Sequence, residues 1–305
     1  MRVLLPAPAG FSFRRSVYSH GWCDLPPFAV SERGDWVATV VAVPEGGARR
    51  MTIHESEDGG VVLETPGSPP RETQRALRAA ARRMLGLDLD LAPFHAAVLG
   101  HPRYAWIATS GTGRFLRAPT MWEDVVKLVL TTNCSWAATK KMVTTLVEKY
   151  GEQAPDGARS FPTPQKLARV RETTYRNVVR AGYRSPLLAS LSKQVASGKA
   201  PIAAWDADTR GSEIVKKEML ALPGVGPYVA ENLLKFLGRP QGLALDSWVR
   251  AKYARLHHGG RKITDRTIHR STARLGEWAG LALWFEMTRD WFDGDHPSAL
   301  WATLS

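Results

Sequence analysis

The chain has 305 residues, 44% of them hydrophobic, and carries 41 Lys and Arg residues against 29 Asp and Glu residues, a formal net charge of +12. This length allows one large or two smaller packed domains, and no apolar run approaches the ~18 residues that cross a bilayer, so we expect a soluble protein. The basic balance favours a polyanionic partner, either nucleic acid or an anionic membrane surface.

Residues 1 to about 67 have the composition of β-strands. The expected strands are separated by glycine, proline and acidic turns, and they cover residues 11–18, 36–43, 48–56 and 60–65. We expect them to form an antiparallel sheet, with the Ala- and Arg-rich segment 72–85 as a helix that lies on it. The first ten residues have too short an apolar core for a secretory signal peptide.

Strand signals end after Gly100, His101 and Pro102, and the pattern is helical from Thr120 onward. Thr120 and Glu123 have the spacing of a capping box at the start of an apolar helix. We therefore expect an α+β protein, with a domain of antiparallel sheet plus helix over residues 1–103 and a helical domain over residues 104–305.

Short polar residues at 131–135 break the first helix of this second domain. Later helices are expected over residues 136–150, from 164, over 171–181 and 186–198, and in the tryptophan-rich tract 278–292. This tract is expected to belong to the core.

Two further helices flank a short turn. The first ends before Pro223, which cannot continue the helical hydrogen bonds, and the second begins at Pro227. The turn residues are Leu222, Pro223, Gly224, Val225 and Gly226. Gly224 and Gly226 lack Cβ atoms, so their N–H groups and those that open the second helix can approach an anion closely. The sequence therefore predicts a phosphate-binding site.

Asp246 follows Gly226 after twenty residues, behind the short apolar segment 243–245, which we expect to be extended. It stands where a third helix, from Ser247 to Leu256, is expected to begin. Asp is a common N-cap residue, so capping alone is one interpretation of its position.

The order of these parts resembles the helix-hairpin-helix (HhH-GPD) DNA glycosylases, whose hairpin reads LPGVGxxxA and is followed by a loop and an aspartate. LPGVGPYVA at 222–230 and Asp246 match both halves at the family's spacing. The hairpin alone would be weaker evidence, because polymerases, ligases and junction-binding proteins also use it to hold a phosphate backbone. The resemblance covers nearly the whole chain and is strongest to the 8-oxoguanine and 3-methyladenine DNA glycosylase II branch.

This resemblance implies a base-excision-repair enzyme that hydrolyses an N-glycosidic bond, with Asp246 as the catalytic carboxylate. The helix behind Asp246 is expected to stabilise its negative charge. The implied substrate is an alkylated or oxidised purine in double-stranded DNA. We expect a monomer of the bacterial cytoplasm or nucleoid that does not bind membranes.

The same resemblance points to residues that would fill the gap left by an extruded nucleotide. Asn133, in the break after the first helix of the helical domain, corresponds to the gap-filling Asn of the family. Tyr183 and Arg184 correspond to its aromatic wedge and to the Arg that faces the orphaned base. Extrusion costs a few kcal/mol of stacking and pairing, which such residues would offset. Taken singly, each has a simpler interpretation as a cap, a half-buried aromatic residue or a surface charge.

The chain departs from the family in informative ways. Bifunctional members carry a lysine that forms a Schiff base two residues after the second hairpin glycine, and this chain has Tyr228 there, which implies a monofunctional enzyme. Lys235 on the same helix is left as a substitute amine, so a bifunctional glycosylase/lyase remains an alternative. A non-catalytic DNA-binding protein is the other alternative, although it leaves Asp246 and Asn133 unexplained.

No cofactor is expected. Only two cysteines, Cys23 and Cys134, occur in the chain, so the four-cysteine iron–sulfur loop of other branches cannot be built, and neither a disulfide framework nor a zinc site is indicated. The resemblance leaves room for a monovalent cation at the hairpin.

An ungapped alignment places Leu283 and Met287 where 8-oxoguanine enzymes contact the base. Neither offers a polar edge or an aromatic face, so the pocket is expected to be more apolar, as the alkylpurine branch prefers. The expected walls are Tyr228, Trp248 and Trp284.

Overall fold

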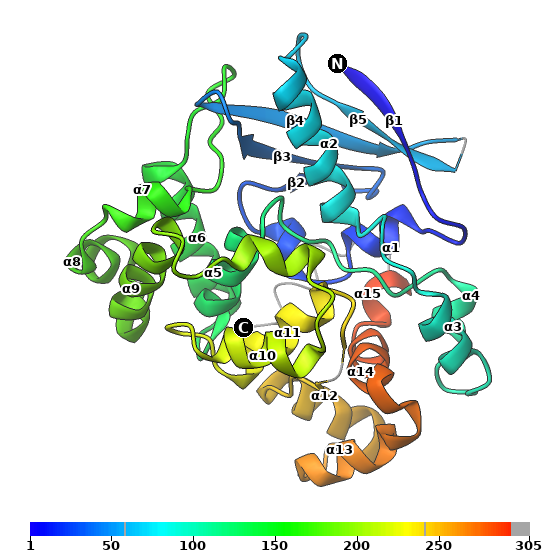
Figure 1. Ribbon diagram of the computed structural model, residues 1–305. Coiled ribbons are helices and arrows are strands. Elements are labelled where there is room, and N and C mark those ends of the chain that lie inside the picture. Colours follow the sequence, from blue (N-terminus) through cyan, green and yellow to red (C-terminus); the bar gives the residue numbers. More distant parts are fainter. Residues whose placement is uncertain (58, 241, 294–305) are drawn as a thin grey trace.

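The computed structural model describes residues 1–57, 59–240 and 242–293, and Figure 1 shows an antiparallel sheet beside a larger helical part. Within that part of the chain the sheet has the strand order β1-β5-β4-β3-β2. Its strands are β1 (Arg2–Pro6), β2 (Ala29–Val30), β3 (Trp36–Ala42), β4 (Ala48–Glu55) and β5 (Gly60–Glu64). The predicted antiparallel sheet at the N-terminus, followed by helices, is therefore confirmed.

The predicted strand over residues 11–18 is wrong, because Phe13–Val17 forms the helix α1. Phe13 and Val17, four residues apart, are both 0% exposed. The Ser16 hydroxyl also donates to the Ser12 carbonyl oxygen at 2.8 Å. The apolar residues of this segment fit both the two-residue period of a strand and the four-residue spacing of a helix. Because Phe13 and Val17 are both buried in the core, the segment forms a helix.

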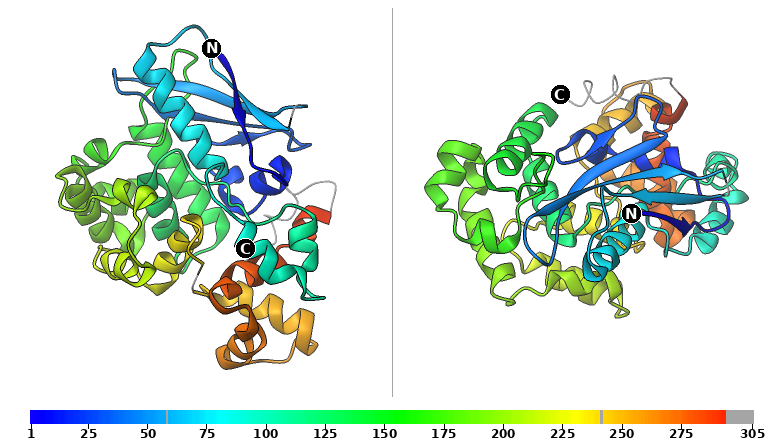
Figure 2. Two further views of the ribbon diagram at one scale, coloured as in Figure 1. Left: turned by 45° about the vertical axis from the view of Figure 1, so that its right-hand side comes forward. Right: turned by 90° about the horizontal axis from the view of Figure 1, so that it is seen from above.

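The helix α2 (Arg71–Leu85) runs across the sheet, as Figures 1 and 2 show, and confirms the prediction for this segment. Leu77, Ala81 and Leu85, spaced four residues apart, are each 0% exposed. The helix thus buries one apolar stripe, while Arg71, Arg75 and Arg78 are exposed. Arg83 turns inward and pairs with the Asp124 carboxylate at 2.7 Å.

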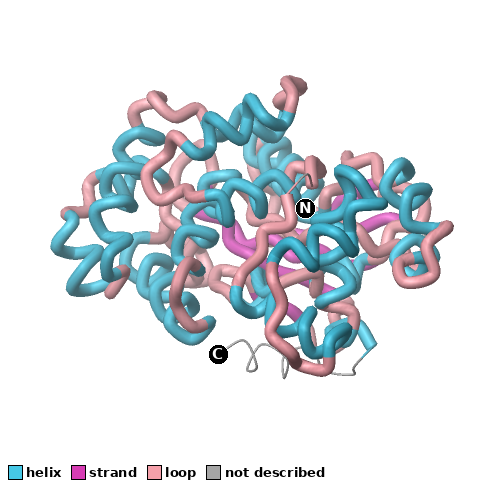
Figure 3. The backbone as a smooth tube through the Cα atoms, turned by 90° about the horizontal axis from the view of Figure 1, so that it is seen from below, coloured by secondary structure: helices cyan, strands magenta, loops and turns pink. Residues whose placement is uncertain are grey.

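The helical part takes up the remainder of the described chain, and Figure 3 shows it from the side away from the sheet. Its α-helices are α3 (Ala92–Leu99), α4 (Ala105–Thr109), α5 (Met121–Thr131), α6 (Trp136–Tyr150), α7 (Pro164–Ala168), α8 (Glu172–Thr174), α9 (Ser185–Ala196), α10 (Ser212–Leu220), α11 (Pro227–Phe236), α12 (Ser247–His258), α13 (Asp265–Thr272), α14 (Ala279–Met287) and α15 (Asp290–Asp293). Figures 1 and 2 place α7 to α9 at one side and α12 to α14 at the other, with α10 and α11 between.

Two local predictions are corrected here. The capping box at Thr120 is half formed: the Thr120 hydroxyl accepts from the Glu123 N–H at 3.3 Å, but the Glu123 carboxylate turns inward and pairs with Lys127 at 2.6 Å. The helix predicted over 171–181 is α8 followed by a π-helical segment, Tyr175–Val179, which ends at Arg180 with φ of 61°.

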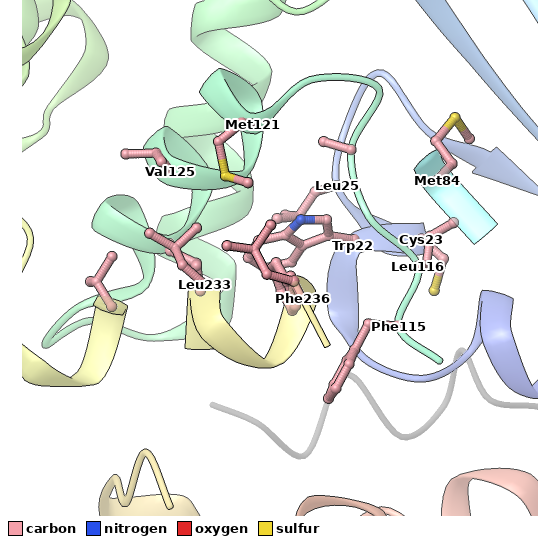
Figure 4. Close-up of a cluster of buried hydrophobic side chains, with 14 of the residues drawn as sticks. Trp22, Cys23, Leu25, Met84, Phe115, Leu116, Met121, Val125, Leu233 and Phe236 are labelled. Carbon is pink, nitrogen blue, oxygen red and sulfur yellow. The ribbon is translucent and has the colours of Figure 1, made fainter. Parts of the chain in front are cut away.

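One large cluster of buried side chains includes residues from both sides of the expected domain boundary at 103/104. Figure 4 shows Trp22, from the N-terminal part, beside Phe236 of α11 in this cluster. The Trp22 Nε1–H also donates to the Asp124 carboxylate of α5 at 2.7 Å. The division into two domains stays a prediction. None of the described helices is both long and apolar enough to cross a membrane.

Candidate active site

The turn between α10 and α11 is formed by Leu222, Pro223, Gly224, Val225 and Gly226, as the sequence predicts. Gly224 has φ of +83°, and a Cβ there would lie 3.3 Å from Val129 Cγ1, so this position requires glycine. Gly226 has an ordinary φ of −91°, and a Cβ there would meet nothing within 4 Å. Open space therefore faces the turn at Gly226, at the N-terminus of α11.

Among the described residues, the N–H groups of the two turn glycines, Gly224 and Gly226, have no protein acceptor, whereas the Val225 N–H donates to the Leu222 carbonyl oxygen at 3.1 Å. No side chain caps α11. Unpaired N–H groups at a helix N-terminus attract anions. The phosphate-binding role of the hairpin stays a prediction, and its geometry suits that role.

Two side chains of α11 form hydrogen bonds with the backbone of the segment that leads to Asp246. The Glu231 carboxylate accepts from the Ala244 N–H at 2.8 Å, and the Lys235 Nζ donates to the Leu243 carbonyl oxygen at 3.0 Å. Ala244 has φ of 49°, so the segment is not extended throughout as predicted. These contacts fix where the chain enters α12.

Asp246 is the N-cap of α12, where its carboxylate accepts from the Val249 N–H at 2.7 Å. The same side chain borders a cavity of about 570 Å³. Asp246 is thus a capping residue that also faces an open space beside the hairpin. Its catalytic role stays a prediction.

The cavity combines polar groups near Asp246 with aromatic walls. Tyr228, Trp248 and Trp284 line it, as expected of a base pocket, together with His20, Trp22, Phe115, Trp136, Asn232, Phe236 and Trp291. The ring centroids of Trp248 and Trp284 are 5.9 Å apart. The sequence alone did not predict this second set. For His20 and Trp22 the signal was the density of aromatic residues in YSHGW at 18–22, and for Trp291 it was the tryptophan-rich tract 278–292.

Leu283 and Met287 do not line the cavity, so this expectation is corrected. They are 1% and 0% exposed and belong to the core. Residues four apart share one face of a helix, and α14 turns this face inward while Trp284 reaches the cavity. An ungapped alignment cannot specify the rotation of a helix about its axis.

Tyr228 lies next to Asp246 in the cavity. Burial raises the pKa of the Tyr228 hydroxyl, and the negative charge of Asp246 raises it further. A neutral phenol therefore occupies the position beside the carboxylate where a lysine would have supplied an amine.

Lys235 does not border the cavity. It is 3% exposed, and its Nζ donates to Leu243 and lies 6.0 Å from the ring centroid of Trp284. Burial lowers the pKa of Lys235 to about 8. Its described contacts are those of a residue that holds the segment before Asp246.

Asn133, Tyr183 and Arg184 come together although fifty residues separate Asn133 from the other two. The Asn133 Nδ2 donates to the Tyr183 hydroxyl at 3.1 Å, and this hydroxyl lies 2.9 Å from the Thr132 Oγ1. Tyr183 is 52% exposed. Asn133 does not cap α6, since Ser135 does, and its φ of 47° projects it from the break between α5 and α6.

Arg184 is not the surface charge of the simpler interpretation. It is 5% exposed, its Nε donates to the Thr132 Oγ1 at 3.1 Å, and its guanidinium carbon lies 4.5 Å from the Tyr183 ring centroid. The Arg184 guanidinium therefore packs against the Tyr183 ring and helps to hold it in place. Its contact with an orphaned base stays a prediction.

Metal ligands are not grouped in this structure: the described residues contain no set of three or more His, Cys, Asp or Glu side chains placed to hold an ion.

The comparisons with known proteins point to one family. The model of the HhH-GPD superfamily, base excision DNA repair proteins, matches residues 126–277. No curated protein matches the chain.

Solved structures share the fold. A 3-methyladenine DNA glycosylase from Archaeoglobus fulgidus superposes with a TM-score of 0.72 at 18% identity, over 96% of this chain and 99% of its own. MBOgg1 in complex with a low-affinity DNA ligand gives 0.71 at 19%, over 95% and 96%. The Clostridium acetobutylicum 8-oxoguanine glycosylase/lyase, in complex with double-stranded DNA containing cytosine opposite 8-oxoG, gives 0.61 at 16%, over 88% and 99%.

Proposed function

The chain belongs to the HhH-GPD superfamily of base excision DNA repair proteins and is a DNA glycosylase, and on this basis we propose that it removes damaged purines by hydrolysis alone. The observation that carries the proposal is the position of Asp246. Its carboxylate caps α12 and borders the same aromatic cavity as Tyr228, which lies in the first turn of α11 just after the hairpin turn. A duplex whose phosphate sits on the hairpin would present an extruded nucleotide to this carboxylate.

In the proposed reaction a water oxygen bonds to the C1′ atom of the sugar as the bond from C1′ to the base nitrogen breaks. The bonding electrons leave with the base, and positive charge develops on the sugar. Asp246 stabilises that charge and takes the proton that the attacking water releases, while solvent supplies the proton that a neutral departing base takes up. No step requires an amine from the protein.

Tyr228 supports hydrolysis without a lyase step. A lyase needs an amine that attacks C1′ and forms an imine, and a phenol cannot do so. Lys235, the other candidate, is 3% exposed and is engaged with the Leu243 carbonyl oxygen. The bifunctional alternative would require Lys235 to leave this contact and enter the cavity.

The proposed substrate is an alkylated or oxidised purine. Aromatic walls at Trp248 and Trp284 offer flat faces to a base, and electron-poor bases stack on such faces favourably. The structures with this fold include enzymes described as acting on 3-methyladenine and on 8-oxoguanine. We propose that the protein binds double-stranded DNA as a monomer, with Asn133 and Tyr183 filling the space that the extruded nucleotide leaves.

The experiment is a single-turnover screen of duplexes that carry one alkylated, oxidised, deaminated or mismatched base. We expect release of at least one alkylated or oxidised purine and no covalent complex after borohydride reduction. Release of pyrimidines only, or a borohydride-trapped complex, would contradict the proposal.

A further inference from the structure

His20 is the only imidazole among the described residues that line the cavity, and together with Trp22, Phe115 and Phe236 it forms the aromatic end of the cavity. It is 5% exposed and borders the cavity. Its ring centroid lies 4.6 Å from that of Trp22, 5.0 Å from Phe236 and 5.4 Å from Phe115. The imidazole is therefore held rigidly as part of the wall.

The hydrogen bond of His20 fixes its tautomer. The Nε2 lies 2.6 Å from the Leu116 carbonyl oxygen. A carbonyl oxygen can only accept, so Nε2 carries the hydrogen and, in the neutral ring, Nδ1 carries a lone pair. Burial lowers the pKa of His20 to about 3, so the ring is neutral at physiological pH.

The Nδ1 of His20 is an unused acceptor. Among the described residues no group donates a hydrogen bond to Nδ1, and Nδ1 is not one of the fully buried polar atoms that lack a partner. The nearby indole donors are already engaged. Trp22 donates to Asp124 at 2.7 Å, Trp284 donates to the Ser19 carbonyl oxygen at 2.9 Å, and Trp136 donates to Asp24 at 2.8 Å.

We propose that the Nδ1 of His20 determines specificity by accepting a hydrogen bond from an N–H group of the extruded base. This inference rests on the proposed function, because it takes the cavity to be the base pocket. The favoured bases carry an N–H on the edge that enters the aromatic end. Examples are 3-methyladenine, with its 6-amino group, and 8-oxoguanine, with its N7–H.

Bases without that N–H are disfavoured. Such a base displaces water from the Nδ1 lone pair of His20 and offers no hydrogen-bond donor in its place. An unmatched buried acceptor lowers the rate by about ten- to a hundred-fold. The bases 1,N6-ethenoadenine and 7-methyl-8-oxoguanine lack the hydrogen and serve as matched partners for 3-methyladenine and 8-oxoguanine.

The test measures the ratio of single-turnover excision rates within each matched pair, for the parent protein and two variants. In His20→Gln the amide N–H reaches toward Leu116 but leaves no acceptor at the place of Nδ1. In His20→Asn the amide oxygen stands at that place without reaching Leu116. Phe115→Leu is the control, since it removes a packed ring beside His20 and keeps the acceptor.

We expect the parent to prefer the N–H member of the pair by about ten- to a hundred-fold. His20→Gln should bring the ratio close to that of the uncatalysed reactions. His20→Asn should retain most of the preference, and Phe115→Leu should slow both members equally. A parent that excises both members equally well, or a preference unchanged in His20→Gln, would overturn the assignment.

Equilibrium binding of the same duplexes in an Asp246→Asn background tests the same hydrogen bond without turnover, as a ratio of affinities. If the parent excised none of the bases, the proposed function would fail, and the binding ratio would still decide the role of His20. Equal binding of both members of each pair would overturn it.

Discussion

The Tyr228 hydroxyl lies beside the Asp246 carboxylate, at the point where α11 and α12 both border the cavity. The segment 229–245 separates the two residues in the sequence, so it is the tertiary structure that brings them together. The pair therefore defines the reacting end of the proposed site: a carboxylate that can stabilise positive charge, next to a phenol that cannot form an imine.

Replacing the phenol by an amine should create a lyase step. We expect Tyr228→Lys to form a covalent complex with damaged duplex after borohydride reduction, at a yield at least about ten-fold above that of the parent protein, because the new amine reaches C1′ beside Asp246. Denaturing gel electrophoresis measures the complex. Tyr228→Phe is the control and should release base without being trapped. Absence of a trapped complex in Tyr228→Lys would indicate that Tyr228 does not face the sugar.

The Asp246 carboxylate can be neutralised with little effect on the fold. Asparagine also accepts a hydrogen bond from the Val249 N–H, so the cap of α12 is kept. We expect Asp246→Asn to reduce single-turnover base release by about a hundred- to a thousand-fold. Binding to a duplex with an abasic-site analogue should stay within a few-fold of the parent. Near-normal base release would show that Asp246 only caps α12 and has no catalytic role.

A carboxylate at Gly226 tests whether the hairpin holds a phosphate. The position has an ordinary φ and open space for a side chain, so the fold should tolerate the change. We expect Gly226→Asp to weaken binding to damaged and undamaged duplex alike by about ten-fold, because it repels the backbone. Gly226→Ala controls for bulk and should bind more tightly than Gly226→Asp. Undamaged DNA bound equally by both variants would place the hairpin away from DNA.

Asn133 and Tyr183 should matter most when the damaged base is paired. Their side chains form one exposed unit through the 3.1 Å hydrogen bond, and filling a vacated stack offsets the cost of extrusion. The Asn133→Ala, Tyr183→Ala double variant should lose about ten- to a hundred-fold more activity on a fully paired duplex than on the same lesion opposite an abasic site. Equal losses on both substrates would fit a contact with phosphate.

Acid should destabilise the protein through His20. Its pKa is lowered from 6.5 to about 3 in the folded protein, so the unfolded chain binds a proton first as the pH falls below 6.5. The stability that His20 contributes is complete above that pH and is lost as the pH falls toward 3. Between pH 7 and pH 4.5 the parent should lose about 3 kcal/mol more than His20→Gln in its free energy of unfolding, measured with urea. Identical losses in both proteins would show that folding does not lower the pKa of His20.

The hairpin and Asp246 could be predicted from the sequence because each depends on a short stretch of chain. Gly224, with its positive φ, and Pro227, at the start of α11, are determined by local backbone geometry. The cap at Asp246 is likewise local, since it involves a backbone N–H three residues away. The strands β3 to β5 follow one another in the chain, so their antiparallel pairing was also predictable.

The tertiary structure decides which residues form most of the walls of the cavity. His20 and Trp22 come from the N-terminal part, Phe115 from a connecting segment, and Trp136 from the start of α6. No spacing in the sequence relates these segments, and the side of α14 that meets the cavity is chosen by packing, which placed Leu283 in the core. Local hydrogen bonds thus specify where a helix begins and ends, whereas the burial of apolar surface between distant segments decides which of its side chains reach the site.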